Sequence, residues 1–295
     1  GVKIAREFAT ETEILAVIGH NARDVSIAAA PIYQEAGLVM ITPTSSANSL
    51  PKIGDYIYRV TPSTRDLANL LADYVVNVAR KQNIAICVDN HAEATRSFKS
   101  DFTWAVYDKG GLINRIECDF AAADFNPTKV PAKVISNGAD ALLLIPSLRY
   151  LDRAIQVARA NTQLQLFGSH TTYSFTTLQQ GQLSVNGMIL PVAWFPKPTE
   201  TNLFIREANK LWGTTGSWRT AMAYDAVQTI LRGLELSNNR EQLKQVLNNP
   251  IFQAQGVSEP ISFMSSGDRI SQGVLVRIEP GEKSGTGYDF VYLDN

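Results

Sequence analysis

The chain alternates short apolar runs with stretches of helical periodicity over most of its length. Continuous apolar runs typical of buried strands occur at Ile14–Ile18, Leu38–Ile41, Ile84–Val88 and Ala141–Ile145. Between such runs, apolar residues recur at helical spacing, as in the segment that begins at Leu67. This alternation predicts an α/β fold with parallel sheets and helices on both faces.

The last part of the chain has a different pattern. Strand-like runs at Pro260–Phe263, Gly273–Ile278 and Tyr288–Leu293 follow one another, joined by turns. The segment Gly281–Gly287 resembles a phosphate-binding loop, but it lacks a glycine directly before its Lys-Ser pair, and no helix follows. We therefore interpret this segment as a flexible turn.

Polar loops follow successive predicted strands of the α/β part. In parallel sheets, ligands bind at the carboxyl ends of strands. The loops at these ends are Gly19–Asp24, Thr44–Asn48, Asp89–Ala94, Pro146–Leu148 and Gly168–Tyr173. Their hydroxyls, backbone N–H groups and helix N-termini suit a carboxylate or another anion. Each loop alone is more simply an ordinary cap or turn, but their succession favours a pocket.

Composition and charge exclude several classes of protein. The 295 residues suffice for two domains, and the net charge of -1, from 27 basic and 28 acidic residues, argues against a nucleic-acid partner. No apolar run is long enough to span a bilayer, and the chain opens into a helical pattern rather than a secretory signal. Cys87 and Cys118 lie in strand-like runs, where buried thiols are the simpler interpretation and a disulfide is the alternative.

Catalytic signatures are missing from the sequence. It contains no Gly-x-Ser-x-Gly elbow and no Gly-x-Gly-x-x-Gly motif opening a helix, and its three histidines lack metal-ligand spacing. His20 ends a strand and is expected to be packed or hydrogen-bonded, whereas His170 is the better candidate for ligand contact. We therefore expect a binding protein without cofactor or metal, rather than an enzyme.

Several motifs together resemble a known family. The run Val17–His20 is followed by Ala28–Pro43, and Tyr58–Pro62, Gly138–Ala141 and Ala223–Ala226 come in the same order. In these segments the chain resembles the type I periplasmic binding proteins of the branched-chain amino-acid and amide class, the class of the leucine/isoleucine/valine-binding proteins. The resemblance covers nearly the whole chain, and the block from Gly19-His20 to Thr42-Pro43 is its most specific part.

The resemblance implies two doubly wound, Rossmann-like lobes joined by a three-strand hinge that closes around ligand. Lobe I would comprise residues 1–63 and 192–264, and lobe II residues 64–191 and 265–295, with the last crossover near Ser265–Asp268. Relatives begin with a strand, a helix and a strand that this sequence lacks. Their absence would leave strand edges and apolar faces of lobe I open, so the chain is expected to be a fragment or to be completed by a partner segment.

The resemblance also implies binding residues in both lobes. By position, these are Ala22, Arg23, Thr44 and Ser46 in lobe I, and Glu93, Ser147 and His170 in lobe II. Arg23 replaces the usual serine and can pair with a carboxylate or point to solvent. Glu93 and Ser147 stand where aromatic residues are usual, and His170 where an acidic residue is usual. These departures put a branched-chain amino acid in doubt; Tyr173, Phe175 or Trp218 can supply packing instead, although each is more simply core.

The expected function is capture of a small polar ligand, an amino acid or amide-like compound, for a membrane permease of the ABC type. A monomer located in the periplasm or outside the cell is expected, with any membrane anchor outside this chain. The alternatives are the sensor ectodomain of a signalling receptor and the effector-binding domain of a repressor; no helix-turn-helix precedes the body. An enzyme is a more distant alternative.

Overall fold

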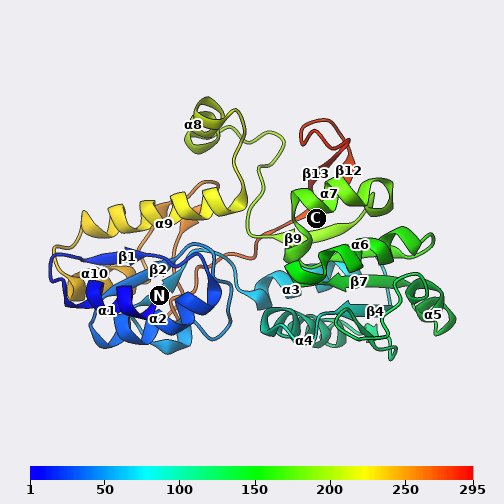
Figure 1. Cartoon of the computed structure of the whole chain (residues 1–295). Coiled ribbons are helices and arrows are strands. Elements are labelled where there is room, and N and C mark those ends of the chain that lie inside the picture. Colours follow the sequence, from blue (N-terminus) through cyan, green and yellow to red (C-terminus); the bar gives the residue numbers. More distant parts are fainter. Residues whose placement is uncertain (295) are drawn as a thin grey trace. The chain divides into compact units, whose positions relative to one another are not determined.

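The computed structural model of the chain describes residues 1–294 and divides into two compact units (Figure 1). Unit 1 comprises Gly1–Ser63 and Ala193–Gln272. Unit 2 comprises Thr64–Val192 and the segment from Gly273 onward. The chain therefore passes from one unit to the other three times.

Unit 1 is built on a three-stranded parallel sheet. Its strands, in the order in which they pair, are β1 (Ala16–Ile18), β2 (Val39–Thr42) and β3 (Ile57–Arg59). All four residues of β2 are buried, because the central strand of a parallel sheet is covered on both faces. β1 lies at an edge of this sheet, where Ile18 is 42% exposed.

Helices cover both faces of this sheet. They are α1 (Val2–Thr10), α2 (Arg23–Glu35), α9 (Trp218–Leu234) and α10 (Arg240–Leu247). α8 (Leu203–Trp212) lies apart from the sheet and contacts α9, where Phe204 packs on Tyr224 (Figure 1). α1 and α2 lie on one side of the sheet and α9 on the other (Figure 1). Tyr33 of α2 packs with Met40 and Ile57 in the core of the unit. Apolar side chains on α8 and α9, such as Trp212 and Leu231, are exposed.

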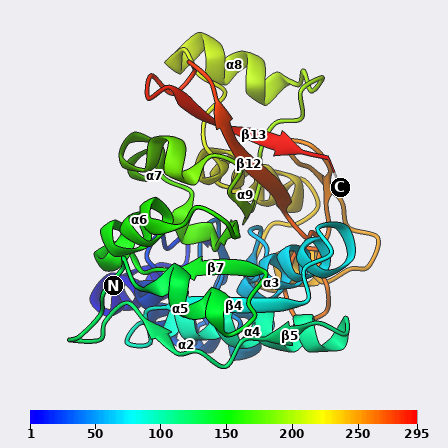
Figure 2. The same cartoon turned by 90° about the vertical axis from the view of Figure 1, so that its right-hand side faces the viewer.

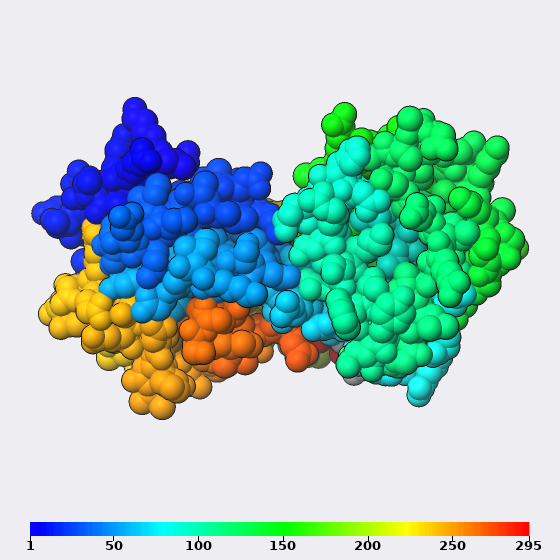
Figure 3. Space-filling view, turned by 90° about the horizontal axis from the view of Figure 1, so that it is seen from below, coloured from blue at the N-terminus to red at the C-terminus, as the bar shows by residue number. Residues whose placement is uncertain are grey.

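Residues 265–272 belong to unit 1, although the resemblance placed them in the second lobe. The backbone N–H of Arg59 donates to the carbonyl of Gly267 at 3.0 Å, and that of Arg269 donates to the carbonyl of Arg59 at 3.1 Å. These bonds add the segment to the free edge of β3. Figure 3 shows this orange part of the chain against the light-blue region that contains β3. A short hairpin of β10 (Ala254–Gln255) and β11 (Pro260–Ile261) precedes it.

Unit 2 contains one mixed sheet. In order of pairing, its strands are β13 (Tyr288–Leu293), β12 (Val274–Pro280), β9 (Ile189–Val192), β8 (Gln165–Gly168), β7 (Ala141–Ile145), β4 (Asn83–Val88) and β5 (Leu112–Ile113). The short strand β6 (Cys118–Asp119) also pairs with β4. The strands from β9 to β5 are parallel to one another. β12 is antiparallel to both of its neighbours, β9 and β13. Figure 2 shows β12 and β13 as a long pair at one end of the unit.

The side chains of β4 alternate between the two faces of the sheet. Ile84, Ile86 and Val88 belong to one core cluster, together with Phe98 and Phe102 of α4 (Glu93–Asp108). Since successive side chains of a strand point to opposite faces, Ala85 and Cys87 face the other way. The remaining helices are α3 (Thr64–Asp73), which runs on as a π-helical turn at Tyr74–Val78, α5 (Val130–Ser136), α6 (Leu151–Ala160) and α7 (Phe175–Gly181).

Side-chain oxygens that accept from backbone N–H groups shape two loops of unit 2. The segment Leu112–Phe120 forms two short strands, β5 and β6, because the side-chain oxygen of Asn114 accepts from the Ile116 N–H and turns the chain between them. The segment Gly281–Gly287 connects β12 to β13, and the buried carboxylate of Asp289 accepts from the N–H groups of Lys283 and Ser284. This is a turn, as expected, but an anchored one.

No helix within residues 1–294 has both the length and the apolar character needed to cross a membrane.

Candidate functional site

The polar loops of unit 1 meet at one edge of its sheet. β1 and β2 are neighbouring parallel strands, so the loops after them leave from the same edge. Ala22 directly precedes the first turn of α2, which begins at Arg23, and Thr44 and Ser46 follow β2. The hydroxyl of Thr44 donates to the carbonyl of Asn21 at 3.0 Å and joins the two loops. The structure thus groups four predicted residues, Ala22, Arg23, Thr44 and Ser46, along one edge.

The side chain of Arg59 is hydrogen-bonded to the second of these loops, Thr44–Asn48. This side chain is 2% exposed; its Nη1 donates to the carbonyl of Ala47 at 2.6 Å, and its Nε donates to Asp268 at 2.5 Å. A buried guanidinium must be paired, and these two oxygen atoms are among its partners. Sequence reasoning missed this role, although a charged residue inside an apolar strand was a signal.

His20 supports the loops rather than presenting its ring to a ligand. Its carbonyl accepts hydrogen bonds from the hydroxyls of Ser26 at 3.0 Å and Thr42 at 3.2 Å. Its ring stacks on Tyr33 with centroids 5.9 Å apart, and Nε2 lies 3.2 Å from the Tyr33 hydroxyl. Burial lowers the pKa of His20, because an imidazolium loses hydration there. The packed role expected for His20 is what the structure shows.

Unit 2 presents a second set of polar loops at the carboxyl ends of adjacent strands. β4, β7 and β8 are neighbours, and Glu93, Ser147 and His170 follow them in turn. Glu93 is exposed in the first turn of α4. The hydroxyl of Thr171 donates to the carbonyl of Pro146 at 2.7 Å and ties the last two loops together. The His170 ring lies 5.7 Å from that of Phe98, centroid to centroid.

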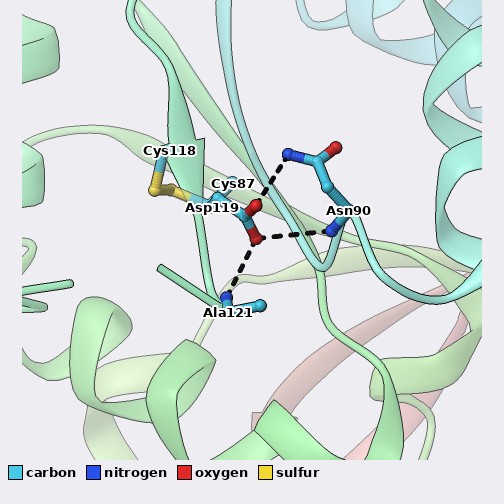
Figure 4. The surroundings of a disulfide bond; sticks show 5 residues. All are labelled: Cys87, Asn90, Cys118, Asp119 and Ala121. Atoms are coloured by element: carbon cyan, nitrogen blue, oxygen red, sulfur yellow. Dashed lines mark hydrogen bonds between the residues drawn. A yellow bond between two sulfur atoms is a disulfide. The ribbon is translucent and has the colours of Figure 1, made fainter. Parts of the chain in front are cut away.

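The two cysteines form a disulfide, which corrects the simpler interpretation of buried thiols. Cys87 of β4 and Cys118 of β6 are partners in a parallel register, and their Cα atoms are 4.5 Å apart. The next residue, Asp119, accepts hydrogen bonds from Asn90 in the loop after β4 (Figure 4). The register between these two strands follows from tertiary packing, so the pairing could not be predicted from the sequence.

The three aromatic residues that were candidates for packing against a ligand, Tyr173, Phe175 and Trp218, have different environments. Trp218 is 9% exposed and belongs to the core of unit 1. Tyr173 packs on Phe290 with centroids 4.3 Å apart. Phe175 is 57% exposed at the start of α7. Of the three, Phe175 has the surface available for ligand packing.

No group of three or more His, Cys, Asp or Glu side chains within the described part of the chain is arranged to hold a metal ion. The chemistry that the two sets of loops offer is hydrogen bonding and charge pairing. Guanidinium, hydroxyl, imidazole and helix N-terminal N–H groups suit a small polar solute that carries a carboxylate.

Comparisons with known proteins agree with this architecture. A family model described as "Periplasmic binding protein" matches residues 1–282. A curated amino acid binding protein of Pseudomonas aeruginosa is 22% identical over 240 residues, which are 78% of this chain and 62% of that protein. The chain thus spans less than two thirds of the length of this relative.

Solved structures share the fold. An ABC transporter substrate-binding protein from Desulfitobacterium hafniense, in complex with Leu, gives a TM-score of 0.81 at 21% identity, covering 98% of this chain and 84% of that one. A leucine-binding protein from Thermotoga maritima gives 0.80 at 18% identity, covering 100% and 83%. A solute-binding protein from Rhodopseudomonas palustris, in complex with p-hydroxybenzoic acid, gives 0.78 at 15% identity, covering 99% and 81%.

These matches confirm the predicted fold class, the two-lobed α/β fold of type I periplasmic binding proteins. Because the family model matches far more than half of its length, this chain belongs to the periplasmic binding protein family.

Proposed function

We propose that this chain captures a small polar solute, an amino acid or a related carboxylate, and delivers it to an ABC-type permease. The observation that carries the proposal is the placement of polar loops at the carboxyl ends of parallel strands in each unit. The family match and the substrate-binding proteins among the relatives support transport rather than the signalling alternative. Solute capture needs no catalytic group, so we propose a binding protein and not an enzyme.

A carboxylate is the ligand group that the site chemistry favours. Two of the similar structures hold leucine and p-hydroxybenzoic acid, which differ in shape and in the amino group but share a carboxylate. In this chain, Arg23 offers a guanidinium at the start of α2, and the N-terminus of a helix is itself a favourable site for an anion. Thr44 and Ser46 offer oxygen atoms for an ammonium group. Glu93, Ser147 and His170 are proposed as contacts from unit 2.

The proposed location is the periplasm or the outside of the cell. The family gives the first support, and the Cys87–Cys118 disulfide gives an independent one, because structural disulfides persist in oxidising compartments. We propose that the chain acts there as a monomer whose macromolecular partner is the permease.

A thermal-shift panel of amino acids, aromatic carboxylates and amides, followed by calorimetry, tests the function. A solute that binds only the native state raises the melting temperature with the logarithm of its concentration. We expect a saturable shift with carboxylates, and a loss of affinity of about tenfold or more in Arg23→Gln, since the lost hydrogen bonds are charge-assisted. Arg6→Gln, at an exposed position of α1, is the matched control. A well-folded sample that responds to no member of the panel would contradict the proposal.

A further inference from the structure

The loop Asp89–Ala94, which carries the proposed contact Glu93, is hydrogen-bonded to an acidic side chain of another strand, Asp119 of β6. The carboxylate of Asp119 accepts from the backbone N–H of Asn90 at 3.3 Å and from its side-chain Nδ2 at 3.0 Å. The same carboxylate accepts from the N–H of Ala121 at 2.9 Å (Figure 4). One acidic side chain therefore clamps the beginning of the loop to the end of β6.

Other contacts of this loop come from β7, where the carbonyl of Ile145 accepts from the N–H of Asp89 at 3.1 Å, and from the loop and α4 themselves. Arg96 donates to the carbonyl of Asn90 at 2.7 Å, and Asp89 accepts from the N–H of His91 at 2.9 Å. Asp119 thus adds a tie between Asn90 and a different strand. Burial raises the pKa of Asp119, but the hydrogen bonds from Ala121 and Asn90 outweigh it, and the net effect is a lowered pKa. The carboxylate is therefore ionised, and an acceptor only, at neutral pH.

β6 is short, and the residue after it, Phe120, is fully buried with its carbonyl accepting from Arg153 at 2.5 Å. The strand has two residues, and beyond its register with β4 it continues in one backbone bond, from the Phe120 N–H to the carbonyl of Val88 at 2.8 Å. The Cys87–Cys118 disulfide fixes that register covalently, one residue before Asp119. The bond joins positions that are 31 apart in the sequence, and all of α4 lies between them.

We infer that Asp119, held on β6 by the Cys87–Cys118 disulfide, is a positioning residue that sets the conformation of the ligand loop Asp89–Ala94. The disulfide fixes β6, β6 places the Asp119 carboxylate, and the carboxylate orders Asn90 at the head of the loop. This inference rests on the proposed function only in calling Asp89–Ala94 a ligand loop; the ordering itself is independent of any ligand.

Hydrogen exchange of the ligand-free full chain tests the ordering. In Asp119→Asn, the N–H groups of Asn90 and Ala121 lose a charged acceptor, and we expect their exchange to accelerate by about tenfold or more. Cys87→Ala/Cys118→Ala should accelerate exchange at Asn90 and Phe120. Asp124→Asn is the control, because it makes the same change at an exposed position five residues along. The inference would be overturned if the Asn90 N–H exchanged as slowly in Asp119→Asn as in the control. If the double cysteine variant does not fold, the Asp119→Asn result decides by itself.

Two further readouts separate positioning from general destabilisation. The amide resonance of Asn90 should follow the ionisation of Asp119 at a pH below the usual aspartate range, and this titration should vanish in Asp119→Asn but persist in Asp124→Asn. Affinity for L-leucine and for p-hydroxybenzoate, measured by calorimetry, should fall at least severalfold in Asp119→Asn with whichever probe the wild type binds, and an unchanged affinity overturns the ligand-loop assignment. A wild type that binds neither probe counts against the proposed function, while the exchange data still decide the ordering.

Discussion

At the scale of single residues, buried polar side chains place the loops of this protein. Arg59 is the clearest case: it lies within an apolar strand, is 2% exposed, and contacts both the Thr44–Asn48 loop and Asp268. A buried charge costs free energy unless it is paired, so each of its partners is constrained by it.

Replacing Arg59 with methionine should therefore be costly. Arg59→Met leaves the carbonyl of Ala47 and the carboxylate of Asp268 without this donor, and we expect the free energy of unfolding to fall by about 3 kcal/mol. Denaturant unfolding measures the change. Lys52→Met, at an exposed position of unit 1, should change stability by about 0.5 kcal/mol or less. Equal values for the two variants would show that the Arg59 contacts contribute nothing.

His20 makes stability depend on pH. Burial lowers its folded pKa below the unfolded value, so the unfolded chain binds a proton more readily. The contribution of His20 is complete above the unfolded pKa of about 6.5 and is lost as the pH falls through that value toward the folded pKa. Urea unfolding between about pH 8 and pH 5 should show a loss that is smaller in His20→Gln. An equal loss in His20→Gln and in the wild type would contradict this assignment.

At the scale of elements, β3 depends on a segment that is distant in sequence. Gly267 lies against this strand with φ at +84°, and an added Cβ would sit 2.2 Å from the carbonyl oxygen of Ile57. Backbone atoms cannot move aside as a flexible side chain can, so only glycine fits there.

Comparing two glycines isolates this close approach. Gly285 also has a positive φ, +74°, but nothing lies within 4 Å of an added Cβ. Gly285→Ala should cost about 1 kcal/mol from backbone strain alone. Gly267→Ala adds a steric clash and should cost about 2 kcal/mol more. Melting curves of both variants check this, and similar losses would mean that the segment yields easily at Gly267.

At the scale of the whole molecule, each unit is assembled from segments that are far apart in the sequence. Unit 2 obtains β12 and β13 from the end of the chain, and β12 pairs antiparallel to β9, with Val274 opposite Val192. Residues 64–192 by themselves would expose the edge of β9 and part of a core that includes Leu275 and Leu293.

A rearranged chain tests whether unit 2 is self-sufficient. Because Val192 and Val274 are opposite each other, a turn of about two residues can join 64–192 directly to 274–294 as a hairpin. We expect this chain to fold with cooperative unfolding and dispersed amide resonances, and residues 64–192 alone to fail. Failure of the joined chain would show that unit 2 requires unit 1 to fold.

The order of strands and helices, and the polar character of the loops after the strands, can be predicted from the sequence alone. These features are local: periodicity, turn residues and apolar runs depend on neighbours a few positions away. Arg23, Thr44, Glu93, Ser147 and His170 could accordingly be placed at strand ends without a structure, and their contact with a ligand stays a prediction.

Which distant residues meet could be learned only from the folded structure. The Cys87–Cys118 bond depends on the register of β6 against β4, and residues 265–272 join unit 1 through bonds to Arg59, about 200 positions earlier in the chain. Strand order and register follow from the packing of the whole core, and a one-residue shift would redirect every side chain of a strand. No local pattern carries that information, which is why the disulfide, the Arg59 contacts and the clamp at Asp119 had to be seen in three dimensions.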